Sequence, residues 1–517
     1  MERHSLDEAL RQEIDDLLDT RAPAADPTAD GIARWETLAS RLETDAAARS
    51  YLAERALFHA ALARSLTTRR LGEWAVERAQ MSMPPAARES RATWRWATAG
   101  LGTLAAIITL ALLVPNGWSG SCASVTRGVG TGVLSAGTVL GRELHELTAG
   151  VLELATQRGG RIVIEAPASF RFESTQRLRL FQGRVSADIP PAAKGFTVVT
   201  PSGEAIDLGT RFAVDVPPTG KAEVHVFSGE VIARGDATPA RSLRDGDAYS
   251  LGTNSARELR TAAFISGDEV GELAAAVADG RDRVSHVAAT RLQADPALVA
   301  WLDFEGGGAT GRTTATDAAG GQYRLVQGRW PGSRAADFTA VGDHIPIDVG
   351  AGRDYPQLTI AAWVRLDRLG APFQSLYHTD GWEADNPGQV HWMLTHAGVM
   401  RLALRGIQLA PGAVERHEHP DSRSPVFGEE GRWIHLAAVY DSEAKTARFY
   451  VDGKFDSETQ AAVAPPARLG RARIGNWNMN DRRLSGRIDE FCILGRALGD
   501  DEIRAIHASG NPYEVAR

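Results

Sequence analysis

The longest apolar run of the chain lies about one fifth of the way along it. From Ala97 to Val114 the sequence reads ATAGLGTLAAIITLALLV, and no charged residue occurs between Arg95 and Arg127. A helix of about 17 to 25 residues crosses the hydrocarbon core of a bilayer, and tryptophans flank this run as interfacial aromatics do. A buried core helix of this length would normally carry a polar face. The pattern therefore predicts a transmembrane helix over residues 94–116.

The charges on the two sides of this run predict its orientation. Seven arginines and only three glutamates lie between positions 64 and 95, whereas the first charge after the run is Arg127. Basic residues remain on the cytoplasmic side of a membrane helix. We therefore expect a single-pass protein of the inner (cytoplasmic) membrane, with a cytoplasmic N-terminus and periplasmic C-terminal domains.

Apolar residues before the run recur at helical spacing, which predicts a small α-helical segment over residues 1–80. These helices either leave an apolar face for a partner or form a self-contained bundle or spacer. The pattern alone leaves both alternatives open.

After the run, the hydrophobic pattern changes to short alternating stretches bounded by Gly, Pro and Ser, which is typical of strands. It predicts an all-β domain over residues 120–250, a linker over 251–297 that is helical at 268–293, and a second β domain over 298–512. The second domain has the strand spacing of a sandwich or jelly roll. Its segment FYVDGKFDSE predicts a hairpin, because Asp-Gly favours a type I′ turn. The predicted fold class is multidomain and mainly β.

Composition narrows the functional classes. The 517 residues carry a net charge of −8 and contain no long basic block, which argues against nucleic acid as a partner. The two cysteines, Cys122 and Cys492, lie in different predicted regions, and a bridge between them cannot be judged from sequence. No Cys/His pattern or acidic loop has the spacing of a metal site. We expect neither a metal nor a cofactor.

Three stretches carry resemblances to known families. The segments EAPASFRFES, LRLFQGRVSADIPPAAKGFTVVTPSGEAIDLGTRF and VHVFSGEV resemble, in family order, the periplasmic domain of FecR-type transmembrane anti-sigma regulators. EIDDLLD and DAAARSYLAERALFHAALA look like the cytoplasmic helical segment of such regulators. The region from ADPALVAWLDFEGG to GRIDEFCILGRALGDDEIRAIHASG resembles a laminin-G-like, concanavalin A-like jelly roll. The arrangement looks like the large membrane regulators of planctomycete-type bacteria.

These resemblances imply a mechanism. Residues 1–80 would bind an extracytoplasmic-function sigma factor, and the outer domains would sense a signal and control its release. The best-known members of the family continue into a domain that docks on an outer-membrane transporter, whereas here a jelly roll follows. The stimulus therefore stays open, and siderophore signalling is in doubt.

The Gly209-Thr210 pair is a candidate for self-cleavage. Some FecR-type regulators, which this segment resembles, split at such a bond, with the threonine hydroxyl attacking the preceding carbonyl. Carried over, Gly209 would supply the carbonyl and Thr210 the nucleophile. The alternative, which we favour from sequence, is a structural glycine at the start of a strand.

Acidic pairs in the second β domain do not predict an enzyme. A glycosidase dyad needs two carboxyl groups at a set separation, and nothing in the sequence fixes that separation for Asp303/Glu305, Asp337, Asp343 or Asp489/Glu490. We expect no enzyme beyond the self-cleavage candidate.

Aromatic residues with amide neighbours give the better indication of a binding site. Exposed tryptophan can stack on a sugar ring while amides bond its hydroxyls. The candidate ligand-binding residues lie in DGWEADNPGQVHW and GNWNMND, namely Trp382, His391, Trp392, Asn476, Trp477 and Asn478. Core packing is the alternative, and Trp363 and Trp433 are assigned to the core.

The sequence thus predicts a single-pass membrane anti-sigma regulator that transmits a periplasmic signal to an extracytoplasmic-function sigma factor. Its jelly roll would take a glycan or a protein ligand. The second hypothesis is a membrane-anchored carbohydrate- or protein-binding module without a sigma partner. Residues 1–80 discriminate between them, because only a regulator needs a structured cytoplasmic segment.

Overall fold

The computed structural model describes residues 121–513 except 236–238, 306–320, 350–352, 370–371, 384 and 411–418. The predicted helical segment 1–80 and the predicted transmembrane helix 94–116 lie outside these residues. Among the helices that are described, none is long and apolar enough to cross a membrane. All described residues belong to one compact unit, Leu112–Arg517. This unit is mainly β, as predicted.

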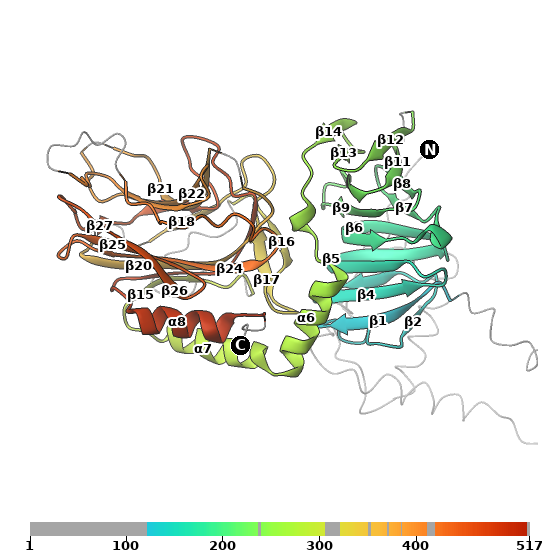
Figure 1. Cartoon of the computed structure of the whole chain (residues 1–517), viewed down its shortest axis with the longest axis horizontal. Helices are drawn as coiled ribbons and strands as arrows, with labels where there is room; N and C mark the ends of the chain where they lie inside the picture. Colours follow the sequence, from blue (N-terminus) through green and yellow to red (C-terminus); the bar gives the residue numbers. More distant parts are fainter. Residues whose placement is uncertain are drawn as a thin grey trace, which may run out of the picture. The chain divides into compact units, whose positions relative to one another are not determined.

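The first β domain is built on one large antiparallel sheet, in which only β6 and β7 pair in parallel (Figure 1). Along its main path the strand order is β12-β11-β8-β7-β6-β5-β4-β1-β2, and β9 joins it through β6. Its strands are β1 (Ala123–Val129), β2 (Val139–Leu140), β3 (His145–Leu147), β4 (Val151–Thr156), β5 (Arg161–Ser174), β6 (Arg177–Asp188), β7 (Thr197–Thr200), β8 (Gly203–Asp207), β9 (Arg211–Val216), β10 (Glu223–Ser228), β11 (Glu230–Gly235), β12 (Arg241–Arg244), β13 (Ala248–Ser250) and β14 (Ser255–Arg257).

Alternation in the two longest strands of this domain builds its core. In β5 and β6 the side chains of Phe170, Phe172, Leu178 and Leu180 are fully buried, while Arg171 between the two phenylalanines is exposed. These four pack into one apolar cluster with residues of β1, β4, β9 and β10. The period-two pattern of the sequence therefore corresponds to one buried face of the sheet.

The predicted helical stretch 268–293 is two helices rather than one. α6 (Gly267–Ala278) ends before Gly280, whose φ of 73° is left-handed, and α7 (Arg281–Gln293) begins directly after it. Glycine adopts this conformation without the cost of a Cβ clash, so it breaks the helix there. Ser266 caps α6 by accepting a hydrogen bond from the Glu269 amide at 3.2 Å.

The second β domain is a two-layer sandwich, whose sheets appear as separate layers in Figure 1. The eight-stranded sheet contains β15 (Leu298–Leu302), β16 (Arg324–Gln327), β17 (Arg334–Asp337), β20 (Gln357–Leu366), β24 (Trp433–Asp441), β25 (Thr446–Val451), β26 (Lys454–Gln460) and β29 (Gly486–Leu494). The five-stranded sheet contains β18 (Ile345–Asp348), β21 (Phe373–Thr379), β22 (Val390–Thr395), β23 (Met400–Leu404) and β28 (Arg471–Ile474). The short strands β19 (Asp354–Tyr355) and β27 (Ala467–Arg468) pair separately.

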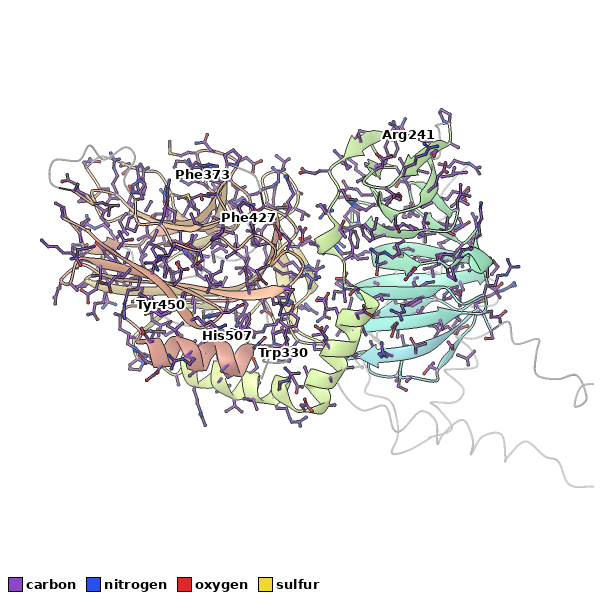
Figure 2. All side chains as sticks on the ribbon, viewed as in Figure 1. Arg241, Trp330, Phe373, Phe427, Tyr450 and His507 are labelled. Atoms are coloured by element: carbon purple, nitrogen blue, oxygen red, sulfur yellow. The ribbon has the colours of Figure 1, made fainter. Side chains whose placement is uncertain are left out.

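The predicted turn and terminal helix of this domain are both present. Asp452 and Gly453 join β25 to β26 with φ values of 49° and 70°, the two positive φ angles of a type I′ turn. α8 (Asp500–Gly510) covers the outer face of the eight-stranded sheet, on the side where Figure 2 shows Tyr450. The Tyr450 hydroxyl donates to Asp500 at 2.7 Å, which fixes the start of the helix.

The assigned core residues are buried. Trp363 and Trp433 are 2% and 5% exposed. Cys122 and Cys492 are both buried, and no disulfide joins them to each other.

Candidate functional site

Two loops that are about 95 residues apart in sequence meet at one end of the five-stranded sheet. The side-chain oxygen of Asn478 accepts a hydrogen bond from the Gly381 amide at 3.1 Å. The indole N–H of Trp477 donates to the Gly381 carbonyl at 3.3 Å. These bonds bring together the two sequence segments in which the binding residues were predicted.

A cluster of aromatic rings connects these loops to the sheet, with His391 of β22 at its centre. The ring centroid of His391 lies 4.1 Å from that of Trp382, 4.9 Å from that of Trp477 and 4.1 Å from that of His378. Burial lowers the pKa of His391 to about 3, so the ring is neutral at physiological pH. Its Nε2 lies 3.2 Å from the Thr379 carbonyl, an oxygen that can only accept a hydrogen bond.

Asn476 positions this loop and is itself fully bonded. Its Nδ2 donates to the Asp343 carbonyl and to Asp481, both at 3.1 Å. Its Oδ1 accepts from the backbone amides of Trp477 and Arg482, both at 2.8 Å. An amide side chain has two donor hydrogens and two acceptor sites, so Asn476 has none left for a ligand.

Trp392 does not join the cluster. Adjacent residues of a strand point to opposite faces of the sheet, so Trp392 enters the sandwich core and is fully buried there, whereas His391 faces the loops. Four of the six predicted residues therefore meet as a group, Asn476 holds their loop, and Trp392 belongs to the core.

The sequence reasoning missed Arg482, which extends the cluster. Its guanidinium carbon lies 4.4 Å from the ring centre of Trp477 and 4.6 Å from that of Phe373. Burial and the neighbouring Arg401 lower the pKa of Arg482. Within the described residues Arg482 forms no ion pair, and its side chain donates only a weak bond to the Met393 sulfur at 3.9 Å. In the sequence, the pair Arg482-Arg483 directly after the segment of Trp477 was the signal that could have indicated this residue.

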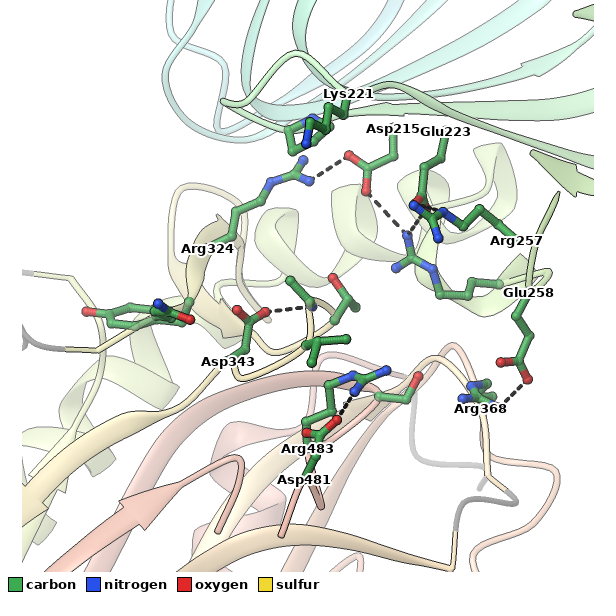
Figure 3. A pocket seen from close by; sticks show the side chains of 18 of the residues that line it. Asp215, Lys221, Glu223, Arg257, Glu258, Arg324, Asp343, Arg368, Asp481 and Arg483 are labelled. Atoms are coloured by element: carbon green, nitrogen blue, oxygen red, sulfur yellow. Dashed lines mark hydrogen bonds and ion pairs between the residues drawn. The ribbon is translucent and has the colours of Figure 1, made fainter. Parts of the chain in front are cut away.

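Arg482 also lines a cleft of about 1450 Å³ at the junction of the two β domains. Figure 3 shows Asp215, Lys221 and Glu223 on the side of the first domain, with Asp343 and Arg483 on the side of the second. Seven basic and five acidic residues line it: Lys221, Arg257, Arg260, Arg324, Arg368, Arg482 and Arg483, and Asp215, Glu223, Glu258, Asp343 and Asp481.

Most of these charges are paired with one another. Arg324 binds Asp215 at 2.6 Å and Arg257 binds Glu223 at 2.9 Å. In the described part of the chain, Lys221 and Arg482 are the two basic lining residues without an ion pair, and Asp343 is the one such acid. Burial raises the pKa of Asp343 to about 6.

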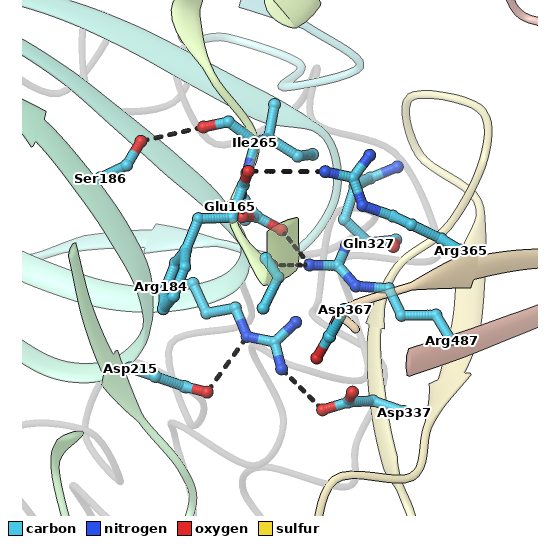
Figure 4. A network of polar contacts seen from close by, with 12 residues as sticks. Glu165, Arg184, Ser186, Asp215, Ile265, Gln327, Asp337, Arg365, Asp367 and Arg487 are labelled. Carbon is cyan, nitrogen blue, oxygen red and sulfur yellow. Dashed lines mark hydrogen bonds and ion pairs between the residues drawn. The ribbon is translucent and has the colours of Figure 1, made fainter. Parts of the chain in front are cut away.

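Beside the cleft, buried ion pairs join the two β domains (Figure 4). Arg184 of β6 donates to Asp337 of β17 at 2.6 Å and to Asp215 of β9 at 3.2 Å. Arg487 of β29 donates to Glu165 of β5 at 2.8 Å. All five side chains are no more than 5% exposed.

Two of the acidic residues weighed in the sequence, Asp337 and Asp489, have structural partners. Asp337 is bound by Arg184, and Asp489 accepts from the backbone amide of Arg329 at 3.0 Å. No group of three potential ligands among the described residues could hold a metal ion.

The self-cleavage candidate lies between β8 and β9. Gly209 has a φ of 100°, and Thr210 is 3% exposed. The Thr210 hydroxyl donates to the Asp207 carboxylate. Burial raises the pKa of Asp207, and its second oxygen has no hydrogen-bond partner among the described residues.

Comparison with known families matches both β domains. Residues 148–232 match the family model described as FecR protein, and residues 339–504 match that of the concanavalin A-like lectin/glucanases superfamily. The chain combines a FecR-like domain with a concanavalin A-like domain. The FecR-like and jelly-roll resemblances drawn from sequence are thereby confirmed, whereas the resemblance of the N-terminal helices stays a prediction outside the described residues. Among curated proteins, none matches the chain.

Solved structures resemble parts of the chain distantly. A putative carbohydrate binding protein from Bacteroides ovatus is 16% identical, with a TM-score of 0.25, over 33% of this chain and 46% of that one. The binding domain of botulinum neurotoxin serotype D is 10% identical, with a TM-score of 0.30, over 41% and 50%. The chain spans about half the length of these structures, and such scores carry no argument about function.

Proposed function

We propose that this protein is a single-pass membrane regulator. Its periplasmic concanavalin A-like domain binds carbohydrate, and its cytoplasmic residues 1–80 bind an extracytoplasmic-function sigma factor. The observation that carries the proposal is the pairing of a FecR-like domain with a concanavalin A-like domain through buried ion pairs. Such a junction favours transmission of a signal from one domain to the other. Because no flexible linker separates the domains there, a ligand bound to one of them also acts on the other.

Charge and hydropathy support the membrane arrangement. The apolar run over residues 94–116 directly precedes the FecR-like domain, and the arginines before it favour a cytoplasmic N-terminus. Reporter fusions at residue 90 and at residue 517 test this topology. A cytoplasmic reporter should be active only at the first position, and activity at both would contradict a single span.

The sigma factor is tested with the full chain. The tagged protein, solubilised from its native membrane, should co-purify a sigma factor that mass spectrometry identifies. A variant lacking residues 1–80 is the matched control and should lose it. If both proteins recover the same set, the membrane-anchored binding module without a sigma partner becomes the better account.

Carbohydrate binding is tested at Trp382, which is partly exposed and contacts no core cluster. Removal of an aromatic ring that stacks on a ligand costs about 1 kcal/mol or more, which is about fivefold in Kd. Trp382→Ala should therefore weaken binding on a glycan array, while Trp392→Phe, a core change, should not. Equal loss in both variants would indicate a folding defect instead of a lost contact.

A second activity, self-cleavage between Gly209 and Thr210, is favoured by the contact between Thr210 and Asp207. Thr210 Oγ would attack the Gly209 carbonyl carbon while Asp207 takes its proton. The C–N bond then breaks, the nitrogen receives that proton, and an ester joins Gly209 to Oγ. Water hydrolyses the ester and leaves a Gly209 carboxylate and a Thr210 N-terminus.

Three substitutions test this step by the appearance of two fragments divided at Thr210. Thr210→Ala should abolish cleavage, Thr210→Ser should retain it, and Asp207→Asn should slow it. Thr200→Ala removes another buried threonine of the same domain and serves as the control. Fragments that persist in Thr210→Ala would exclude hydroxyl-driven cleavage at this bond.

A further inference from the structure

We propose that the cleft between the two β domains binds an acidic saccharide, with Arg482 and Lys221 as the contacts for its carboxylates. This inference rests on the carbohydrate-binding part of the proposed function and adds to it a ligand class and a location. The ligand would contact both domains at once, because Lys221 belongs to the first and Arg482 to the second.

The first argument is the geometry of Arg482. Aromatic rings lie against its guanidinium at 4.4 Å and 4.6 Å, so the rings of Trp477 and Phe373 hold the group in place. Its N–H groups lie in the plane of the guanidinium, and among the described residues the Met393 sulfur is their one acceptor. A fixed planar fork without a carboxylate partner matches a carboxylate of a ligand, which it can bind through two parallel hydrogen bonds.

The second argument is that Arg482 lacks the carboxylate partner that the neighbouring arginines have. Arg257, Arg260 and Arg324 in the same cleft bind protein carboxylates. The protein therefore supplies carboxylates to most arginines of the cleft and not to Arg482, even though Arg482 is half-buried. A desolvated charge without a partner is costly, and an anionic ligand would supply the missing partner.

The third argument selects a saccharide over an acidic peptide. The cleft, at about 1450 Å³, exceeds the 300–1000 Å³ that is usual for drug-sized ligands, which suits an oligosaccharide of several rings. The aromatic rings of Tyr323 and Phe373 line the cleft beside the amide side chains of Gln322 and Asn480. Aromatic rings beside hydrogen-bonding groups suit the apolar faces and hydroxyls of sugars.

The experiment measures binding of the full chain, in detergent or nanodiscs, to an array of carboxylated oligosaccharides. The array holds galacturonate, glucuronate and sialic acid oligomers, each beside its neutral methyl ester, and a polyglutamate peptide. We expect at least one acidic saccharide to bind about tenfold or more tightly than its ester, since hydrogen bonds to charged groups contribute about 1.5–3 kcal/mol. The preference should diminish as salt is raised.

Variants then locate the contact. Arg482→Ala should remove the preference for the acid, and Arg482→Lys should restore only part of it because the fork is lost. Lys221→Ala, an exposed change that does not threaten folding, should weaken binding about threefold or more. Arg471→Ala changes the net charge equally at an exposed position outside the cleft and should have no effect.

Each remaining outcome has a defined meaning. Equal binding of acids and esters, lost in Trp382→Ala, would overturn this inference and leave carbohydrate binding in place. Binding of polyglutamate alone would overturn it in favour of an acidic protein partner. Binding of no saccharide would overturn both the inference and the carbohydrate-binding part of the proposed function.

Discussion

The junction of the two β domains contains two regions of opposite character. In the buried network, Arg184 and Arg487 have carboxylate partners from the other domain and are almost fully buried. In the neighbouring cleft, Arg482 and Lys221 have no such partner among the described residues. Asp215 belongs to both regions, since it binds Arg184 in the network and Arg324 at the cleft wall. One interface therefore both joins the domains through buried ion pairs and contains two cations without a carboxylate partner among the described residues.

The largest effect is expected when an arginine of the buried network is removed. Arg184→Ala leaves Asp337 buried without its ion pair, and breaking a buried pair from one side costs about 3–5 kcal/mol. Guanidinium denaturation of the solubilised chain, followed by tryptophan fluorescence, measures the loss in the free energy of unfolding.

Two controls show whether burial of the remaining charge causes that loss. Arg368→Ala breaks the Arg368–Glu258 pair, which also crosses the junction but is exposed, and should cost about 1 kcal/mol or less. The double change Arg184→Met with Asp337→Leu removes both charges and should recover much of the stability. If Arg184→Ala costs no more than Arg368→Ala, the network does not hold the domains together.

The sequence predicted only part of the contrast between the buried network and the cleft. Alternation of apolar and polar residues predicted the strands, and Asp-Gly predicted the hairpin turn, because both signals act over a few residues. The charge pairs were not readable, because Arg184 and Asp337 are 153 positions apart. The aromatic and amide residues of their segments predicted that Trp382 and Trp477 belong to one binding site. Arg482 was missed because a sequence does not show whether a carboxylate lies near it in the folded protein.

A second prediction concerns the histidines beneath the cluster. Burial lowers the pKa of His391 to about 3, whereas an unfolded histidine titrates near 6.5. The unfolded state thus binds the proton first, so stability is complete above about pH 6.5 and is lost as the pH falls towards 3. For one histidine the loss at pH 5 is about 2 kcal/mol.

Denaturation at pH 7 and pH 5 measures this loss, and His391→Gln should remove about that amount of the pH dependence. The other histidines whose pKa values burial lowers, namely His145, His225, His378, His435 and His507, should keep the remainder. Asp343 acts in the opposite sense, since its raised pKa of about 6 makes its contribution decline as the pH rises from 4 to 6. The exposed His286→Gln is the control, and an unchanged profile in His391→Gln would mean that this ring is not buried neutral.

The smallest change in the free energy of unfolding is expected for Arg482→Ala. This variant tests most directly whether Arg482 differs from the arginines of the buried network. Unlike Arg184→Ala, this change leaves no protein carboxylate without its ion pair, because none binds Arg482 in the described residues. What is lost is the contact with two rings, worth about 1 kcal/mol, and the removal of a half-buried charge offsets part of it. The free energy of unfolding should therefore fall by about 1 kcal/mol or less, in the same assay in which Arg184→Ala loses several times more. A loss as large as that of Arg184→Ala would mean that Arg482 stabilises the fold as the network arginines do, and the cleft would then hold no cation free for a ligand on that side.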